Sequence, residues 1–153
     1  MKSSILRWSG TFPCVTATLA SCAALVANAA SPLPDPCKLV TVAEMEKIVG
    51  PLAETPRVTD EKTTCSYTPA KGLSFVDVSL HEGDLAAMRR SDSQKNAVPL
   101  PDFGKDAFVN PNFHEYADLY AKKGNLIVRV TVPMGPTSVD MVKAIARKAL
   151  ARL

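Results

Sequence analysis

Hydrophobic and polar residues alternate most regularly between residues 126 and 132. Every even position there is leucine or valine, whereas Arg129 and Thr131 stand at odd positions. Because successive side chains of a strand point to opposite faces, this period of two predicts a strand with one buried face. The same alternation predicts a strand over residues 74–80, where Val76, Val78 and Leu80 are apolar and alternate with Asp77 and Ser79.

Further strands are predicted from shorter patterns. A strand is expected over residues 113–121, and residues 122–125, which include a glycine, predict a hairpin turn into the strand at 126–132. Short strands are expected at 63–68 and 107–109, and an Asn-Pro-Asn turn is expected after the second of them. The second half of the chain is therefore expected to be mostly sheet.

Helices are predicted at three places. Thr41 and Glu44 have the T-x-x-E spacing of a capping box, and Gly50 followed by a proline ends that first helix. Asp84 predicts the start of a short helix that runs to about residue 93. Thr137 is expected to cap a final helix with an apolar stripe at helical spacing. The residues of this stripe are Val142, Ile145, Ala146, Ala149 and Leu153.

The predicted order of elements is roughly α-β-β-β-α-β-β-β-α. Strands that follow one another through short turns favour antiparallel pairing, and amphipathic helices need a sheet face to cover. We therefore expect one α+β domain, with a mainly antiparallel sheet and about three helices packed on it.

Residues 1–29 have the layout of a secretory signal peptide. Basic residues near the start precede an apolar stretch at about 12–26, and Ala27 and Ala29 supply the small side chains at the cleavage site. The apolar stretch is shorter than the roughly 20 residues of a membrane span. We expect cleavage after Ala29, a proline-rich tether over 30–36 and one domain over 37–153, located in the periplasm or secreted.

A second route of processing stays open. Residues 19–22 read Leu-Ala-Ser-Cys, which is similar to a bacterial lipobox. In that route Cys22 is acylated and becomes the new N-terminus. The product would then be a membrane-anchored lipoprotein that has no membrane span of its own.

The cysteine count changes once the leader is removed. Of four cysteines, Cys37 and Cys65 remain, and an even pair in an oxidising compartment is expected to form a disulfide. A redox or metal pair is the rival interpretation. The wide spacing of the two cysteines and the presence of only two histidines argue against it. We expect neither a metal site nor a cofactor.

The charge balance is close to neutral in the mature chain. Lys2 and Arg7 are the only charged residues of the leader, so its removal leaves 16 of the 18 basic residues against 15 acidic ones. No basic patch is evident in the pattern, and nucleic-acid binding is not expected.

Four short motifs together resemble a known group of proteins. They are a C-x-L-V-T-x-x-E segment at residues 37–44 that is followed by Gly50, a C-x-Y at residues 65–67, a G-x-D-A-F at residues 104–108, and a K-x-G turn at residues 122–124. This pattern is similar to small exported bacterial proteins, often lipoproteins, whose function is uncharacterised. The resemblance implies an extracytoplasmic α+β domain with paired cysteines, and it brings no catalytic residues.

The polar face of the predicted sheet is the best candidate site. Aromatic side chains beside an arginine on an open sheet can stack on a ligand or fill an interface. The alternatives are an ordinary solvated face and a face that a helix partly covers. The predicted binding residues are His81, His114, Tyr116, Tyr120 and Arg129, with Asp77, Ser79, Asp118 and Thr131 projecting alongside them.

Catalytic patterns are weak in this chain. His81 or His114 with a neighbouring aspartate and a serine could in principle form a triad, but no G-x-S-x-G elbow supports it. We predict no catalytic residue, and a hydrolase ranks below two binding functions. The first is a non-catalytic module that contacts an envelope protein through the sheet face or the loop at 99–103. The second is a small-ligand carrier or sensor with a pocket between sheet and helices.

Overall fold

The computed structural model describes residues 33–60, 62–91 and 94–153. The predicted signal peptide and the lipobox cysteine, Cys22, lie outside the described residues. In the described part of the chain no helix has both the length and the hydropathy that crossing a bilayer would need.

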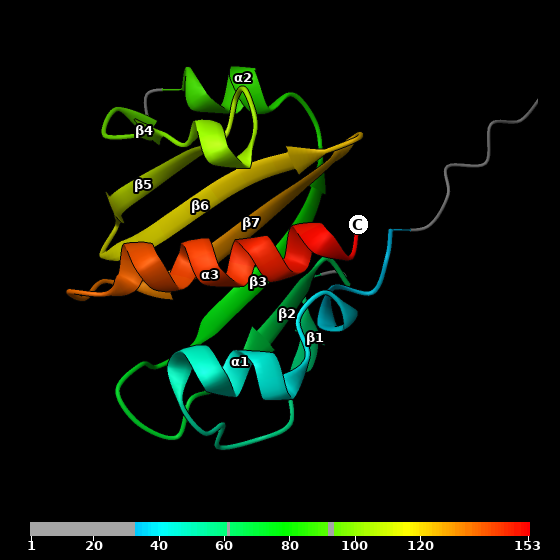
Figure 1. Cartoon of the computed structure of the whole chain (residues 1–153), viewed down its shortest axis with the longest axis vertical. Helices are drawn as coiled ribbons and strands as arrows, with labels where there is room; N and C mark the ends of the chain where they lie inside the picture. Colours follow the sequence, from blue (N-terminus) through cyan, green and yellow to red (C-terminus); the bar gives the residue numbers. More distant parts are fainter. Residues whose placement is uncertain (1–32, 61, 92–93) are drawn as a thin grey trace, which may run out of the picture. The chain divides into compact units, whose positions relative to one another are not determined.

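Seven strands form one sheet in which every pairing is antiparallel (Figure 1). The spatial order is β1-β2-β3-β7-β6-β5-β4, so the last strand of the chain lies at the centre. This confirms the predicted α+β class. The strands are β1 (Arg57–Thr59), β2 (Thr64–Tyr67), β3 (Val76–Glu82), β4 (Val98–Pro99), β5 (Phe108–Phe113), β6 (Tyr116–Lys123) and β7 (Leu126–Pro133).

The helices begin where capping residues predict. In α1 (Val42–Val49) the Thr41 hydroxyl accepts from the Glu44 backbone N–H, and the Glu44 carboxylate accepts from the Thr41 N–H, which confirms the capping box. Gly50, with φ of 86°, ends the helix. Asp84 caps α2 (Leu85–Arg89) as predicted, although α2 ends earlier than expected. The chain also forms two short 3-10 helices, η1 (Pro36–Lys38) and η3 (Pro101–Phe103).

The cap predicted for the last helix is confirmed in its position but not in its hydrogen bond. Thr137 stands at the N-cap position of α3 (Ser138–Ala151), but its side chain makes no capping hydrogen bond. The hydroxyl of Ser138 donates instead to the Pro133 carbonyl at 2.7 Å. The helix is therefore tied to the end of β7 by its first residue, because that strand end lies directly beneath it.

The turn predicted at residues 110–112 is also wrong. β5 continues to Phe113, and the reversal falls at His114 and Glu115, whose φ values are 49° and 69°. The register of β5 is irregular between Asn110 and Phe113. An irregularity of this kind lets Pro111 remain in a strand, because a residue without an N–H can sit there.

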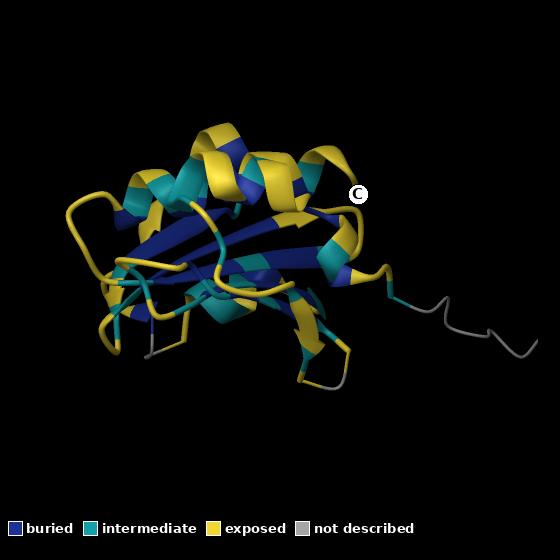
Figure 2. Cartoon of the chain, turned by 90° about the horizontal axis from the view of Figure 1, so that it is seen from below, coloured by how far each residue is buried: buried dark blue, intermediate teal, exposed yellow. Residues whose placement is uncertain are grey.

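One face of the sheet, called here the closed face, is covered by α1 and α3 (Figure 2). Valines of β3 and β7, together with Leu119 of β6, have no exposed surface there and pack against the apolar stripe of α3. Cys65 belongs to the same core, and its disulfide to Cys37 ties η1 to β2. The Tyr67 hydroxyl donates to the Val40 carbonyl at 2.7 Å, and this hydrogen bond links β2 to the segment before α1.

The opposite face is covered at one end only. Leu85 of α2 packs with Phe108, Tyr120 and Ile127 in a separate small apolar cluster. The rest of this face, called here the open face, carries polar side chains, and no helix among residues 33–60, 62–91 and 94–153 covers it.

Candidate functional site

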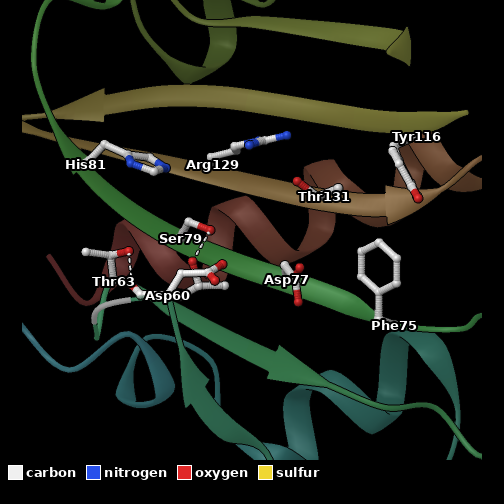
Figure 3. A pocket seen from close by; sticks show the side chains of 10 residues that line it. Asp60, Thr63, Phe75, Asp77, Ser79, His81, Tyr116, Arg129 and Thr131 are labelled. Atoms are coloured by element: carbon white, nitrogen blue, oxygen red, sulfur yellow. Dashed lines mark hydrogen bonds between the residues drawn. The ribbon is translucent and has the colours of Figure 1, made fainter. Parts of the chain in front are cut away.

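A pocket of about 290 Å³ lies on the open face. Its walls come from strands β2, β3, β6 and β7, from the turn between β1 and β2, and from Phe75 just before β3 (Figure 3). This site is called the open-face pocket. Its lining residues are Asp60, Thr63, Thr64, Phe75, Asp77, Ser79, His81, Tyr116, Arg129 and Thr131.

Strand register explains why these side chains meet. Asp77 pairs with Thr131, and Ser79 pairs with Arg129, across the β3–β7 ladder. Directly opposite residues of neighbouring strands point to the same face, so the odd positions of β3 and β7 form adjacent rows. The hydroxyls of Ser79 and Thr64 lie 2.9 Å apart across the β2–β3 pair and hydrogen-bond to each other.

Arg129 is held in place by a buried aspartate. Its Nε and Nη2 donate to the two carboxylate oxygens of Asp118 at 3.2 and 2.9 Å, and the Thr131 hydroxyl also donates to Asp118. The Asp118 side chain is 0% exposed, whereas that of Arg129 is 31% exposed. Burial lowers the pKa of Arg129, but the hydrogen bonds and charge of Asp118 outweigh burial and raise it. Arg129 therefore stays charged, and its charge is balanced within the protein.

Asp77 is in the opposite situation. Its Oδ1 atom is buried and has no hydrogen-bond partner, the one such side-chain atom among residues 33–60, 62–91 and 94–153. Burial raises the pKa of this carboxyl, a hydrogen bond from Ser66 partly offsets that effect, and Asp60 raises it further. A buried acceptor without a donor costs free energy, which a bound donor would recover.

His81 lies at the Arg129 end of the pocket (Figure 3). Burial lowers its pKa, and the positive charge of Arg129 lowers it further. The imidazole is thus neutral at neutral pH. His81 offers a neutral donor or acceptor beside a fixed guanidinium rather than a second cation.

Two aromatic rings form the other end of the pocket. The centroids of Phe75 and Tyr116 are 5.4 Å apart, and the rings are tilted by 52° (Figure 3). Asp77 lies next to Phe75 on the same face of the strand, two residues further along. The pocket thus runs from an aromatic end, past a half-buried carboxyl, to an arginine and a neutral histidine.

The structure brings together three of the five predicted binding residues. His81, Tyr116 and Arg129 line the open-face pocket, and Asp77, Ser79 and Thr131 join them as expected. The binding roles themselves remain predictions.

Two of the predicted residues lie elsewhere. His114 was expected on the strand face, but it forms the β5–β6 turn, where its ring packs edge-on against Phe113. Tyr120 is 4% exposed, because α2 covers it and its ring stacks on Phe108 at 4.8 Å. The covering of part of this face by a helix was one of the alternatives left open by the sequence.

Sequence reasoning missed four residues that line the pocket, namely Phe75, Asp60, Thr63 and Thr64. Phe75 continues the odd-numbered row of Asp77, so extending the same alternation by one step would have found it. Asp60 and Thr63 belong to the hairpin between β1 and β2, and no pattern in the sequence marked β1 as a strand. Asp60 has a φ of 47°, a left-handed backbone that the turn requires.

The arrangement does not reproduce catalytic or metal-binding geometry. His81 faces Arg129, whereas a triad needs its histidine beside a carboxylate. Asp118 is already engaged by Arg129 and Thr131. In the described part of the chain, no three His, Cys, Asp or Glu side chains gather closely enough to hold a metal ion.

The loop at residues 99–103, expected as a second contact surface, is exposed at Pro99, Pro101 and Asp102, whereas Phe103 is buried. Phe103 belongs to the core beneath α3, and the Arg147 guanidinium lies 4.9 Å from its ring centroid. Pro99 pairs with Phe108 in the sheet. The open face carries a pocket lined by several of the predicted binding residues, and it is therefore the better candidate surface.

Comparisons with known proteins add little to this geometry. No family model matches the chain, and no curated protein matches it. A solved structure of a GTP-binding regulator from Thermotoga maritima is similar at 11% identity, with a TM-score of 0.36. The match covers 76% of this chain and 92% of that one. A likeness at this level carries no argument for function.

Proposed function

We propose that this protein is a non-catalytic extracytoplasmic binding module that holds a partner through the open-face pocket. The observation that carries the proposal is the buried Oδ1 of Asp77, which has no donor within the described residues. A polar group of a partner would supply that donor. Functional sites commonly retain such costly polar groups, because their partner is a ligand and not another part of the fold.

The size of the pocket favours one protruding group over an enclosed small molecule. Ligand cavities usually measure about 300–1,000 Å³ and bury most of the ligand. The open-face pocket is at the lower limit, at about 290 Å³, and it opens to solvent. It fits a single side chain of a larger partner.

The surroundings of the pocket favour an extended partner segment. Tyr116 also lines a neighbouring hollow with Glu115 and Met134, and Met134 lines a third hollow beside α3. The three hollows thus follow one another around the end of the sheet. Met134 is among the few large apolar residues that are exposed.

The alternative of a carrier with a pocket between sheet and helices has no such support. Residues with no exposed surface fill the space between the closed face and α3. The open-face pocket lies on the other side of the sheet, and the third hollow is lined by residues at the end of α1 and at the start of α3.

The export part of the proposal rests on the leader pattern and on the disulfide. A disulfide between Cys37 and Cys65 is expected to persist outside the cytoplasm. Intact-mass measurement on protein from the native host tests this directly. A mass beginning at Ala30 supports export as a free protein, an acylated mass beginning at Cys22 supports a lipoprotein, and a full-length chain with free thiols would contradict export.

Photo-crosslinking tests the binding function. Benzoylphenylalanine is placed at position 75 in the pocket and, as a control, at exposed position 140 on α3. We expect one discrete adduct from position 75 in envelope extracts and none from position 140. Excess unlabelled wild-type protein should abolish the adduct, whereas excess Tyr116→Ala protein should not. Equal adducts from both positions, or none from position 75, would count against the proposal.

A further inference from the structure

We infer that the group bound in the open-face pocket is a cation, namely the ammonium of a lysine on an extended segment of a partner protein. This inference rests on the proposed function and specifies its ligand. Three observations carry it: the charge balance around the pocket, the buried acceptor of Asp77, and the aromatic pair at one end.

The charge balance around Asp77 is negative. The charged groups facing it are Asp60 from the β1–β2 turn, Arg129 from β7 and Asp118 from β6. Arg129 is balanced by its two hydrogen bonds to Asp118. His81, on the same strand as Asp77, is neutral because burial and Arg129 lower its pKa. The carboxylates of Asp60 and Asp77 therefore remain without a counter-ion among the described pocket residues.

An acceptor without a partner selects a donor. The Oδ1 of Asp77 can accept a hydrogen bond, and an ammonium brings three donors together with the opposite charge. An anionic group in the pocket would lie near two carboxylates as well as near Arg129. The hydroxyls of Ser79 and Thr64 are bonded to each other, and that of Thr131 donates to Asp118.

The aromatic end suits the rest of a lysine side chain. Phe75 and Tyr116 form a tilted pair beside Asp77. Aromatic faces attract cations and pack well against the methylene stem of lysine. The ammonium would thus lie over the rings and against Asp77, while the backbone of the partner continues toward the hollow at Glu115 and Met134.

The inferred site has a defined pH dependence. Burial raises the pKa of Asp77 above its ordinary value, and only the ionised carboxyl pairs with an ammonium. Binding should therefore be weak where Asp77 is protonated and should strengthen as the pH rises through this raised pKa. His81 contributes in the same direction, because it loses any positive charge over the rise to neutral pH.

Three blocked tripeptides test the inference on the purified disulfide-bonded protein. They are Gly-Xaa-Gly with lysine, norleucine or glutamate at the centre, so that norleucine removes only the ammonium and glutamate reverses the charge. Binding is followed by NMR shifts of the amides of Asp77, Tyr116 and Arg129. We expect saturable shifts with the lysine peptide and binding at least about tenfold weaker, or 1.4 kcal/mol, with norleucine. Equal binding of lysine and norleucine, or tighter binding of glutamate, would overturn the inference.

Matched variants separate the pocket from general charge effects. Asp77→Asn should weaken binding of the lysine peptide about tenfold or more, whereas Asp140→Asn makes the same charge change on exposed α3 and should leave binding unchanged. Amide spectra of both variants check that they fold. Unchanged binding by Asp77→Asn would overturn the inference. A position-75 adduct that persists while the lysine peptide fails to bind would refute the ammonium and leave the binding module intact.

Discussion

The two faces of the sheet are built from the same strands but bury different groups. On the closed face, valines and Leu119 have no exposed surface and lie under α1 and α3. On the open face, Asp77 and Arg129 occupy the alternate positions of the same strands, with α2 covering one end only. The closed face stabilises the domain by burying apolar area, while the open face retains a buried carboxyl that burial destabilises.

This contrast separates stability from function within one sheet. Substitutions on the closed face should lower the free energy of unfolding without touching the open-face pocket. Substitutions in the pocket should alter binding while they change stability much less than substitutions on the closed face.

The largest expected effect is that of the disulfide, which belongs to the closed face. Replacing Cys37 and Cys65 together by serine should lower the free energy of unfolding by about 3–4 kcal/mol, because the bond closes a 28-residue loop in the unfolded chain. Urea denaturation of wild type and variant measures this. An unchanged denaturation midpoint would show that the bond does not stabilise the fold.

A cavity on the closed face should have an effect of similar size. Leu119→Ala should cost about 2–5 kcal/mol, because the side chain is fully buried against the α3 layer. Phe75→Ala removes a larger side chain from the open face, yet it should cost only about 1 kcal/mol, since Phe75 is partly exposed. Comparable losses in thermal denaturation of the two variants would contradict the division between faces.

Two aspartates of the open face should respond differently to the same substitution. Asp118→Asn should cost about 2–3 kcal/mol, because it removes charge-assisted hydrogen bonds to Arg129 and leaves a guanidinium unpaired. Asp77→Asn should change stability by less than about 0.5 kcal/mol or increase it, since an amide is less costly to bury than a carboxylate. A large loss from Asp77→Asn in chemical denaturation would mean that its role is structural.

The smallest expected effect is a pH-dependent difference between wild type and Asp77→Asn. The pKa of Asp77 is raised in the folded state, so the favourable contribution of its protonated form is fully present below pH 3.8, the ordinary value. That contribution is lost as the pH rises through the raised pKa. The stability of Asp77→Asn relative to wild type should therefore increase between pH 3 and pH 7, as measured by urea titration. A constant difference over this range would contradict the raised pKa.

Local signals in the sequence predicted most of the elements. The alternation at β7 and β3, the capping box at Thr41 and the cap at Asp84 all depend on residues close together in the chain. They could be recognised because backbone geometry imposes periods of 2 and 3.6, and capping needs specific side chains within a few positions. Turns were less reliable: the β5–β6 reversal falls at His114 and Glu115, since the irregularity after Asn110 keeps Pro111 in the strand.

The candidate site was only partly predictable. His81, Tyr116 and Arg129 were found because their strands showed a clear polar face. Tyr120 satisfied the same pattern but lies under α2, and nothing local shows where a short helix will pack. Asp60 enters the pocket from a hairpin whose first strand, β1, has three residues and no recognisable alternation.

The α+β class, the two faces of the central strands and the pairing of Cys37 with Cys65 could all be predicted from the order of residues alone. These follow from short-range periodicity and from the chemistry of single residues. That Asp118 neutralises Arg129 while Asp77 keeps an unpaired buried oxygen depends on the assembled sheet. Both aspartates sit at polar positions of strands that flank β7, and their difference arises from which side chains distant in sequence come within hydrogen-bonding distance once the sheet assembles.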